Sequence, residues 1–250
     1  VVGNDEMDEG AGHFLYVDNV TLSGGGFHTG YDGGKYYAGP GFNTLAVEDA
    51  CWERVNKLNI GVDVELFNQL NITFDWFYDH RHKIFMKRGS WPVFLGYFGA
   101  TPWSNIGEVD NRGVELSVNW HKEVIKDLYI DLRGNFTYNK NKYVYFDEPK
   151  YETVWTRKNG LPLSYMWGYV SDGYFTSEEE IANWPDQTGL GSQVKPGDLK
   201  YRDINGDGVI NSSDGIMLSP FGGMPRIQYG LGLNLVYKKL DFGVFFNGSA

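Results

Sequence analysis

The chain has 250 residues, a formal net charge of −10 and a single cysteine, Cys51. An acidic chain without clustered lysine and arginine argues against a nucleic-acid partner, and a lone cysteine excludes a disulfide within the chain. With 33 glycines and 16% aromatic residues, the composition favours an all-β protein with many turns.

The first feature in chain order is a glycine-rich region, residues 22–41. It contains Gly24–Phe27 and Asp32–Gly34. We expect both to be flexible turns rather than phosphate-binding loops, because neither precedes a helix. The chain starts abruptly at Val1 and stops inside an expected strand at Ala250, so we expect a segment of a longer protein.

Three segments then alternate apolar and polar residues with a period of two, the pattern of a strand that has one apolar and one polar face. Each segment is a pair of strands joined by a short turn. The pairs are 58–66 with 70–78, 114–120 with 128–138, and 227–237 with 240–246, and the turns are expected at 68–69, 121–126 and 238–239.

The connections between these pairs, residues 81–111 and 139–226, are much longer than the turns. Strands of about 9–11 residues with short turns at one end and long loops at the other are typical of a transmembrane β-barrel. The sequence therefore predicts an all-β, antiparallel transmembrane β-barrel segment with long extracellular loops. The polar strand face, for example Asp131 and Arg133, would line a hydrated interior. The alternative is a secreted, calcium-dependent β-sandwich that binds carbohydrate, because sandwich strands also alternate.

One short helix is expected in the second long connection, within residues 175–184. Ser177 and Glu180 have the spacing of a capping box. The acidic run 178–180 complements a helix N-terminus, and Pro185 would end the helix.

Residues 203–214, DINGDGVINSSD, have the spacing of a calcium-binding loop. Such a loop presents oxygen ligands at alternating positions and has a glycine at the sharp turn, here Gly208. Ile210 would point inward and anchor the loop. The expected ligands are Asp203, Asn205, Asp207, the Val209 carbonyl, Asn211 and Asp214. The alternative is an Asx-rich turn whose side chains cap backbone amides without metal. No helix with an apolar stripe follows, so we expect structural calcium rather than a conformational sensor.

Several motifs, taken in order, resemble SusC/RagA-type TonB-dependent outer-membrane transporters. The run Gly197–Ile210, with Asp214 and then Pro225–Gly230, is similar to the signature near the end of those proteins. Further similar stretches are Val2–Asn4, Trp52–Glu53 with Lys57–Gly61, Asn105–Glu115 and Gly173–Ile181.

The resemblance implies that residues 1–250 are a C-terminal-proximal part of an outer-membrane β-barrel, and that residues 139–226 are a long extracellular loop region containing the loop 203–214. It also implies import of glycans or of other large nutrients such as peptides. The implied partners are a SusD-like surface lipoprotein, outer-membrane lipid, and the TonB complex, which would be contacted through an N-terminal part outside this chain. No catalytic motif is present, so we expect no enzymatic activity. The sequence identifies no substrate-binding residues.

Overall fold

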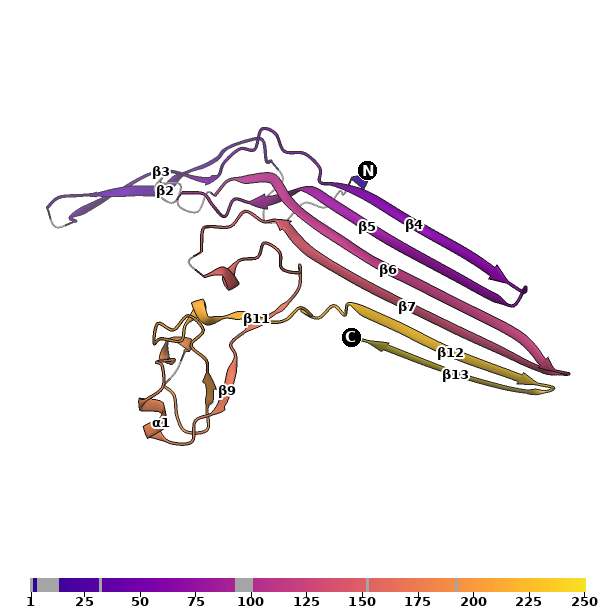
Figure 1. Ribbon diagram of the computed structural model, residues 1–250. Helices are drawn as coiled ribbons and strands as arrows, with labels where there is room; N and C mark the ends of the chain where they lie inside the picture. Colours follow the sequence, from indigo (N-terminus) through magenta and orange to yellow (C-terminus); the bar gives the residue numbers. More distant parts are fainter. Residues whose placement is uncertain (1, 4–13, 32, 93–100, 152, 192) are drawn as a thin grey trace. The chain divides into compact units, whose positions relative to one another are not determined.

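The computed structural model describes residues 2–3, 14–31, 33–92, 101–151, 153–191 and 193–250. Its regular structure is almost entirely antiparallel β-strand (Figure 1). The helices in the described part of the chain are all too short to span a bilayer. The chain divides into two compact units, one of Val1–Gly61, Asp75–Gly113 and Asn141–Lys150, the other of Val62–Phe74, Val114–Lys140 and Tyr151–Ala250.

The main sheet has seven strands in the order β1-β4-β5-β6-β7-β12-β13. Strands that follow one another as hairpins in the chain are neighbours in the sheet, as in an up-and-down barrel wall. The predicted antiparallel all-β fold is therefore confirmed, and the three predicted pairs are β4–β5, β6–β7 and β12–β13. The strands are β1 Val2–Gly3, β4 Arg54–Leu66, β5 Leu70–Lys87, β6 Trp103–Ile125, β7 Leu128–Tyr145, β12 Ile227–Tyr237 and β13 Leu240–Ser249.

Two of the three hairpin turns lie where the sequence predicts them. Asn68 and Lys238 have left-handed backbones with φ of 52° and 54°. The prediction of a turn over residues 121–126 was wrong, because β6 continues to Ile125 and the chain turns at the next two residues. The β-branched Val124 and Ile125 favour the strand, whereas Asp127, with φ of 64°, belongs to a residue type that tolerates the left-handed region.

The glycine-rich region forms a separate two-stranded sheet, in which β2 (Asn19–Thr29) pairs with β3 (Lys35–Thr44). Gly24–Phe27 lies inside β2, so the prediction of a flexible turn there was wrong. A Cβ atom at Gly41 would lie 2.6 Å from the carbonyl carbon of Gly24, and only glycine permits so close an approach of two backbones. The expected turn at Asp32–Gly34 lies partly outside the described residues.

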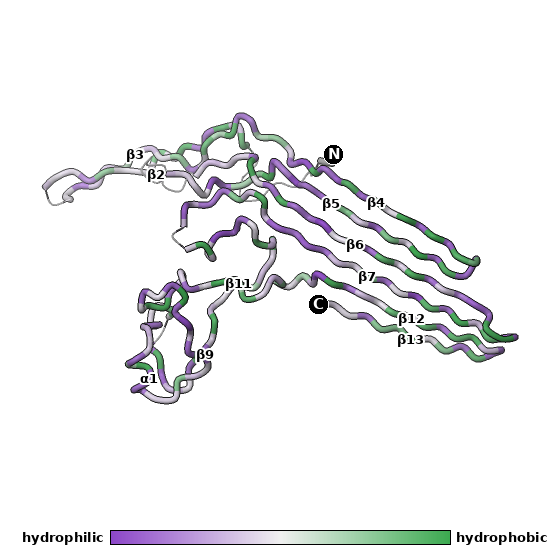
Figure 2. The backbone as a smooth tube through the Cα atoms, viewed as in Figure 1, coloured by the Kyte–Doolittle hydropathy of each residue, from purple (hydrophilic) through white to green (hydrophobic). Residues whose placement is uncertain are grey.

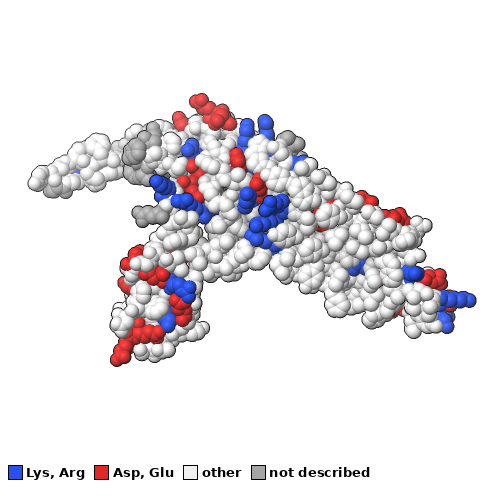
Figure 3. Space-filling model, in the orientation of Figure 1, with Lys and Arg blue, Asp and Glu red and all other residues white. Residues whose placement is uncertain are grey.

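The connection between β7 and β12 folds into short elements, and charged side chains gather on it around the helix α1 (Figure 3). In this connection β8 pairs with β11 and β9 pairs with β10, each pair antiparallel. β7 itself continues to Tyr145, so the first residues of the range 139–226 are strand. The elements are η3 Val154–Thr156, β8 Met166–Gly168, β9 Ser171–Tyr174, α1 Glu178–Ala182, η4 Thr188–Leu190, β10 Leu199–Tyr201, η5 Ser212–Asp214 and β11 Ile216–Ser219.

Few hydrophobic side chains are buried in the described part of the chain. The buried ones are Val47, Val55, Phe85, Val109, Phe175 and Ile210. None of them belongs to the alternating apolar residues of the three predicted hairpins. Those residues recur along the strands (Figure 2) and many are exposed, for example Leu58 at 50% and Ile60 at 56%. The long strands are therefore not folded around a water-excluding core on their apolar face.

Candidate functional site

The strands β7, β12 and β13 present one continuous apolar surface. Directly paired residues of neighbouring strands point to the same face. Leu233 pairs with Leu132 on β7 and with Val244 on β13, and the next apolar residue, Leu231, pairs with Phe246. Leu231 and Phe246 are 58% and 64% exposed. An exposed apolar surface of this kind marks a contact with lipid or with another protein.

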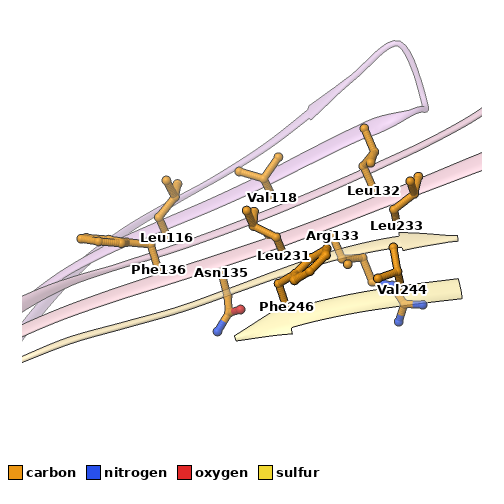
Figure 4. Close-up of a pocket in the computed structure, with 12 residues that line it drawn as sticks. Leu116, Val118, Leu132, Arg133, Asn135, Phe136, Leu231, Leu233, Val244 and Phe246 are labelled. Atoms are coloured by element: carbon orange, nitrogen blue, oxygen red, sulfur yellow. The ribbon is translucent and has the colours of Figure 1, made fainter. Parts of the chain in front are cut away.

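A hollow of about 540 Å³ lies on this apolar surface (Figure 4). It arises where Gly134, which has no side chain, pairs with Leu231. In Figure 4 Leu132 projects from one side of the sheet, whereas Arg133 and Asn135 project from the other. The side chains that line the hollow include Leu116, Val118, Leu132, Phe136, Leu231, Leu233, Val244 and Phe246.

The opposite face of the same strands is polar. Asn234 on β12 pairs with Asp131 on β7. The Arg133 Nε lies 3.7 Å from the Asp131 Oδ1, with the two side chains 58% and 45% exposed. An ion pair this exposed is worth little stability, so its charges suit a surface in contact with water. This arrangement agrees with the hydrated interior expected from the alternation.

The loop 203–214 brings all six predicted calcium ligands into one short turn. Gly206 and Gly208 have φ of 76° and 84°, which lets the chain wrap around the Asp203 carboxylate. The backbone N–H groups of those two glycines donate to Asp203 at 2.6 and 2.8 Å. Asn205 and Asp207 in turn accept from the N–H groups two residues further on, at 3.0 and 2.8 Å.

The last predicted ligand, Asp214, is fully buried. Its carboxylate accepts hydrogen bonds from the N–H groups of Ile204 and Asn211, both at 2.9 Å, and of Asn205 at 3.3 Å. It therefore fastens the beginning of the loop to its end. Ile210 is also fully buried, as the sequence predicts for the anchoring position.

The oxygens of this loop thus act as acceptors for backbone amides, which is the arrangement expected of an Asx-rich turn. Among the described residues, no three His, Cys, Asp or Glu side chains converge to form a metal-binding group. Calcium binding at residues 203–214 stays a prediction.

The helix α1 begins as predicted, because the Ser177 hydroxyl accepts from the Glu180 N–H at 3.2 Å. The Glu180 carboxylate does not complete the predicted capping box. It accepts from the Lys200 Nζ at 2.6 Å and from the Thr176 N–H and hydroxyl, each at 2.8 Å. These bonds lower the pKa of Glu180 from 4.5 to about 2, and the bond to Lys200 has the largest effect.

A second polar contact, which the sequence does not reveal, connects the ends of β5 and β7. Asp147 is only 4% exposed and accepts from the Arg88 Nε at 2.6 Å and from the Ser90 hydroxyl at 2.7 Å. Burial opposes ionisation of this carboxyl, but its bonds to Ser90 and Arg88 outweigh burial and lower its pKa. Gly89 and Asp147 come so close that a Cβ atom on Gly89 would collide with the Asp147 carbonyl.

Comparison with known proteins extends these observations. Residues 12–249 match the family model described as TonB dependent receptor-like, beta-barrel. TonB-dependent receptor P3 of Formosa agariphila is 27% identical over 221 residues, which cover 82% of this chain and 21% of that protein. TonB-dependent receptor SusC of Bacteroides thetaiotaomicron is 26% identical over 204 residues, which cover 78% and 19%. The chain therefore spans about a fifth of the length of these curated relatives.

The RagAB peptide transporter has a similar fold. Its structure superposes on 98% of this chain with a TM-score of 0.62 at 18% sequence identity, and 24% of that chain is covered. The RagAB peptide importer in its open-open state gives a TM-score of 0.60 at 20% identity, with the same coverage. At these identities the likeness shows a shared fold.

Because one strand face is apolar and the other polar, we expect a charged substitution to have different effects on the two faces. We expect Leu233→Arg to destabilise the folded protein by about 2–4 kcal/mol, because it places a cation on the lipid-facing side. Asn234→Arg, one residue away on the polar face, is the matched control and should change stability little. The measurement is the denaturant midpoint of the full-length protein in lipid vesicles. Equal effects of the two substitutions would show that the faces are assigned wrongly.

The Glu180 contacts predict a pH dependence of the α1 region. Because the folded-state pKa lies below the ordinary value, these bonds stabilise the fold above about pH 4.5 and are lost as the pH falls towards 2. We expect Glu180→Gln to raise amide hydrogen exchange around α1 at pH 7. Glu179→Gln, which removes the same charge from the same helix turn, should not. If both variants exchange alike, the Lys200 and Thr176 bonds do not hold the segment.

Proposed function

The chain belongs to the TonB-dependent receptor family of β-barrel proteins, and on that premise we propose that it is part of an outer-membrane transporter that imports large nutrients. Members of the family lie in the outer membrane, so the predicted location and the predicted SusC/RagA-type resemblance are both confirmed. The family is one of receptors and transporters. Import, its substrate and its partners are properties of whole proteins of this family, and this chain spans about a fifth of the length of the curated relatives.

The exposed apolar strand face is the observation that carries the proposal. A β-sandwich would bury that face against a second sheet, yet Leu231 and Leu58 remain 58% and 50% exposed. A barrel turns the same face to lipid and keeps the polar face towards an aqueous interior. The alternative of a secreted β-sandwich module therefore fits neither the exposed face nor the family.

The proposed substrates are glycans or peptides. The peptide class is supported by the description of one similar structure as a peptide transporter. The glycan class is what the resemblance to SusC/RagA-type transporters implies. We further propose that a SusD-like surface lipoprotein covers the extracellular end, and that the TonB complex supplies the energy. The long connection between β7 and β12, with its own small sheets and exposed tyrosine Tyr174 at 65%, offers a surface for such a partner.

Uptake by the source bacterium tests this function. Deleting the gene should abolish growth on one glycan or peptide mixture as the sole nutrient, and the intact gene should restore it. A charge substitution in the TonB-contacting segment of the full-length protein should abolish growth while leaving substrate bound at the surface. Unchanged growth of the deletion strain on every glycan and peptide that the bacterium uses would contradict the proposal.

We also propose that the loop 203–214 binds calcium as a structural ion. The donor types and their spacing support it, because calcium prefers six or more oxygen ligands and a compact loop with a sharp glycine turn. Binding would require the Asp203 and Asp207 carboxylates to turn from the backbone amides towards the ion. The buried Asp214 already joins the two ends of the loop, so little of the chain would need to move.

Calorimetric titration of the metal-free, full-length protein with calcium checks this proposal. We expect one site, lost in Asp207→Asn and retained in Asp186→Asn. Asp186 is a suitable control because its carboxylate accepts from the Thr188 N–H at 2.9 Å and lies outside the ligand set. Absence of binding heat in the unsubstituted protein, or equal affinity in both variants, would rule out this site.

A further inference from the structure

A pocket of about 590 Å³ lies within the connection between β7 and β12. Its walls come from the small sheet β9–β10 and from the segment between α1 and β10. Leu199 and Tyr201 of β10 line it, and alternate residues of a strand share a face. Lys200 therefore points to the other side, where its Nζ lies 2.6 Å from Glu180. We call this pocket the tyrosine pocket, after Tyr169, Tyr174 and Tyr201 in its wall.

Hydrogen bonds hold the walls of the tyrosine pocket in place. The buried Gln187 donates from its Nε2 to the Leu199 carbonyl at 2.9 Å and accepts from the Tyr201 N–H at 3.2 Å. The turn that carries Asp198 is fastened to the end of β9, because the Asp198 carbonyl accepts from the Phe175 N–H at 2.9 Å, and Phe175 is itself buried. The pocket is therefore formed without a ligand, as is usual for small-ligand sites.

The three tyrosines give the pocket neutral aromatic rings. The ring centroids of Tyr169 and Tyr201 are 5.5 Å apart at an interplanar angle of 52°, so the two rings are tilted rather than stacked. Tyr174 is 65% exposed. Burial, and then the Asp214 carboxylate, raise the pKa of Tyr169, so its hydroxyl stays protonated at neutral pH. The face of such a ring is negative and attracts cations.

The pocket has one charge of its own, and it is negative. Among the described residues that line it, Asp198 alone is charged at neutral pH, and no lysine, arginine or histidine is present. The Asp198 Oδ2 accepts from the Lys195 N–H at 2.9 Å, and the residue is exposed, so the carboxylate can take a further partner. Positive charge is the one ligand property that both a carboxylate and a tyrosine ring face attract.

We propose that the tyrosine pocket binds the cationic side chain of a lysine or arginine in an imported peptide. The ammonium or guanidinium group contacts the Asp198 carboxylate, and the aliphatic stem packs against the tyrosine rings and Leu199. The inference rests on the import function proposed above, and within it on the peptide class. It adds a preference for basic peptides that the peptide class alone does not imply.

Binding of two capped peptides to the full-length protein in neutral detergent micelles tests this pocket, with affinities from saturation-transfer NMR titrations. The peptides are alike except at the central position, which is lysine in one and the uncharged analogue norleucine in the other. We expect the lysine peptide to bind roughly tenfold more tightly. Asp198→Asn should lower this preference roughly fivefold, and Tyr174→Leu roughly twofold.

Two matched controls keep the groups that attract the cation. Tyr174→Phe retains the ring, and Glu179→Gln removes a negative charge from α1, so both should keep the preference of the unsubstituted protein. In Asp198→Asn the new amide oxygen can still accept from the Lys195 N–H, which preserves the turn. Equal affinity for the two peptides, no binding of either, or the same preference in Asp198→Asn and Glu179→Gln would overturn the pocket.

The gene-deletion experiment separates this inference from the import function. Loss of growth in the deletion strain, together with equal affinity of the protein for the two peptides, would overturn the tyrosine pocket and leave import standing. Unchanged growth, together with a lysine preference that depends on Asp198, would support the cation site and count against import. A neutral hexasaccharide that displaces the lysine peptide only when Tyr174 is present would overturn the cationic class of ligand.

Discussion

The structure depends on one constraint, that backbone N–H and C=O groups placed in hydrocarbon must find partners within the protein. Antiparallel pairing satisfies them along β4 to β7, β12 and β13, and hairpins make neighbouring strands adjacent in the sheet. Once the backbone is paired, each strand has two faces of opposite character. The apolar face needs no core because lipid supplies the apolar surroundings, which explains why so few hydrophobic residues are buried.

The long connections are held together differently, because few of their apolar side chains are buried. Carboxylates that accept several hydrogen bonds organise them. Asp214 joins the ends of the loop 203–214, Asp147 joins the ends of β5 and β7, and Glu180 joins α1 to β10. Charge-assisted hydrogen bonds are stronger than neutral ones, so a few of them can shape a loop where a hydrophobic core is missing.

Polar side chains on β5 and β6 lie where these two regimes meet. On the same strands and the same face, alternation passes from leucine and valine through aromatic residues to Tyr78, His80 and Arg112. A strand longer than the hydrocarbon layer must leave it, and β6 with 23 residues is far longer than a barrel span requires.

Local spacing along the chain was enough to predict the strand pairs, their two faces, two of the three turns, the Ser177 cap and the buried Ile210. The sequence also carried the family motifs. Three features became visible only in the folded chain: β6 runs on to Ile125, Gly24–Phe27 lies in a strand, and Glu180 bonds to Lys200 and Thr176. The fold likewise brought Asp110 to Tyr78 and His80, which are about thirty residues away. These outcomes depend on partners distant in the chain, and periodicity reports only on neighbours.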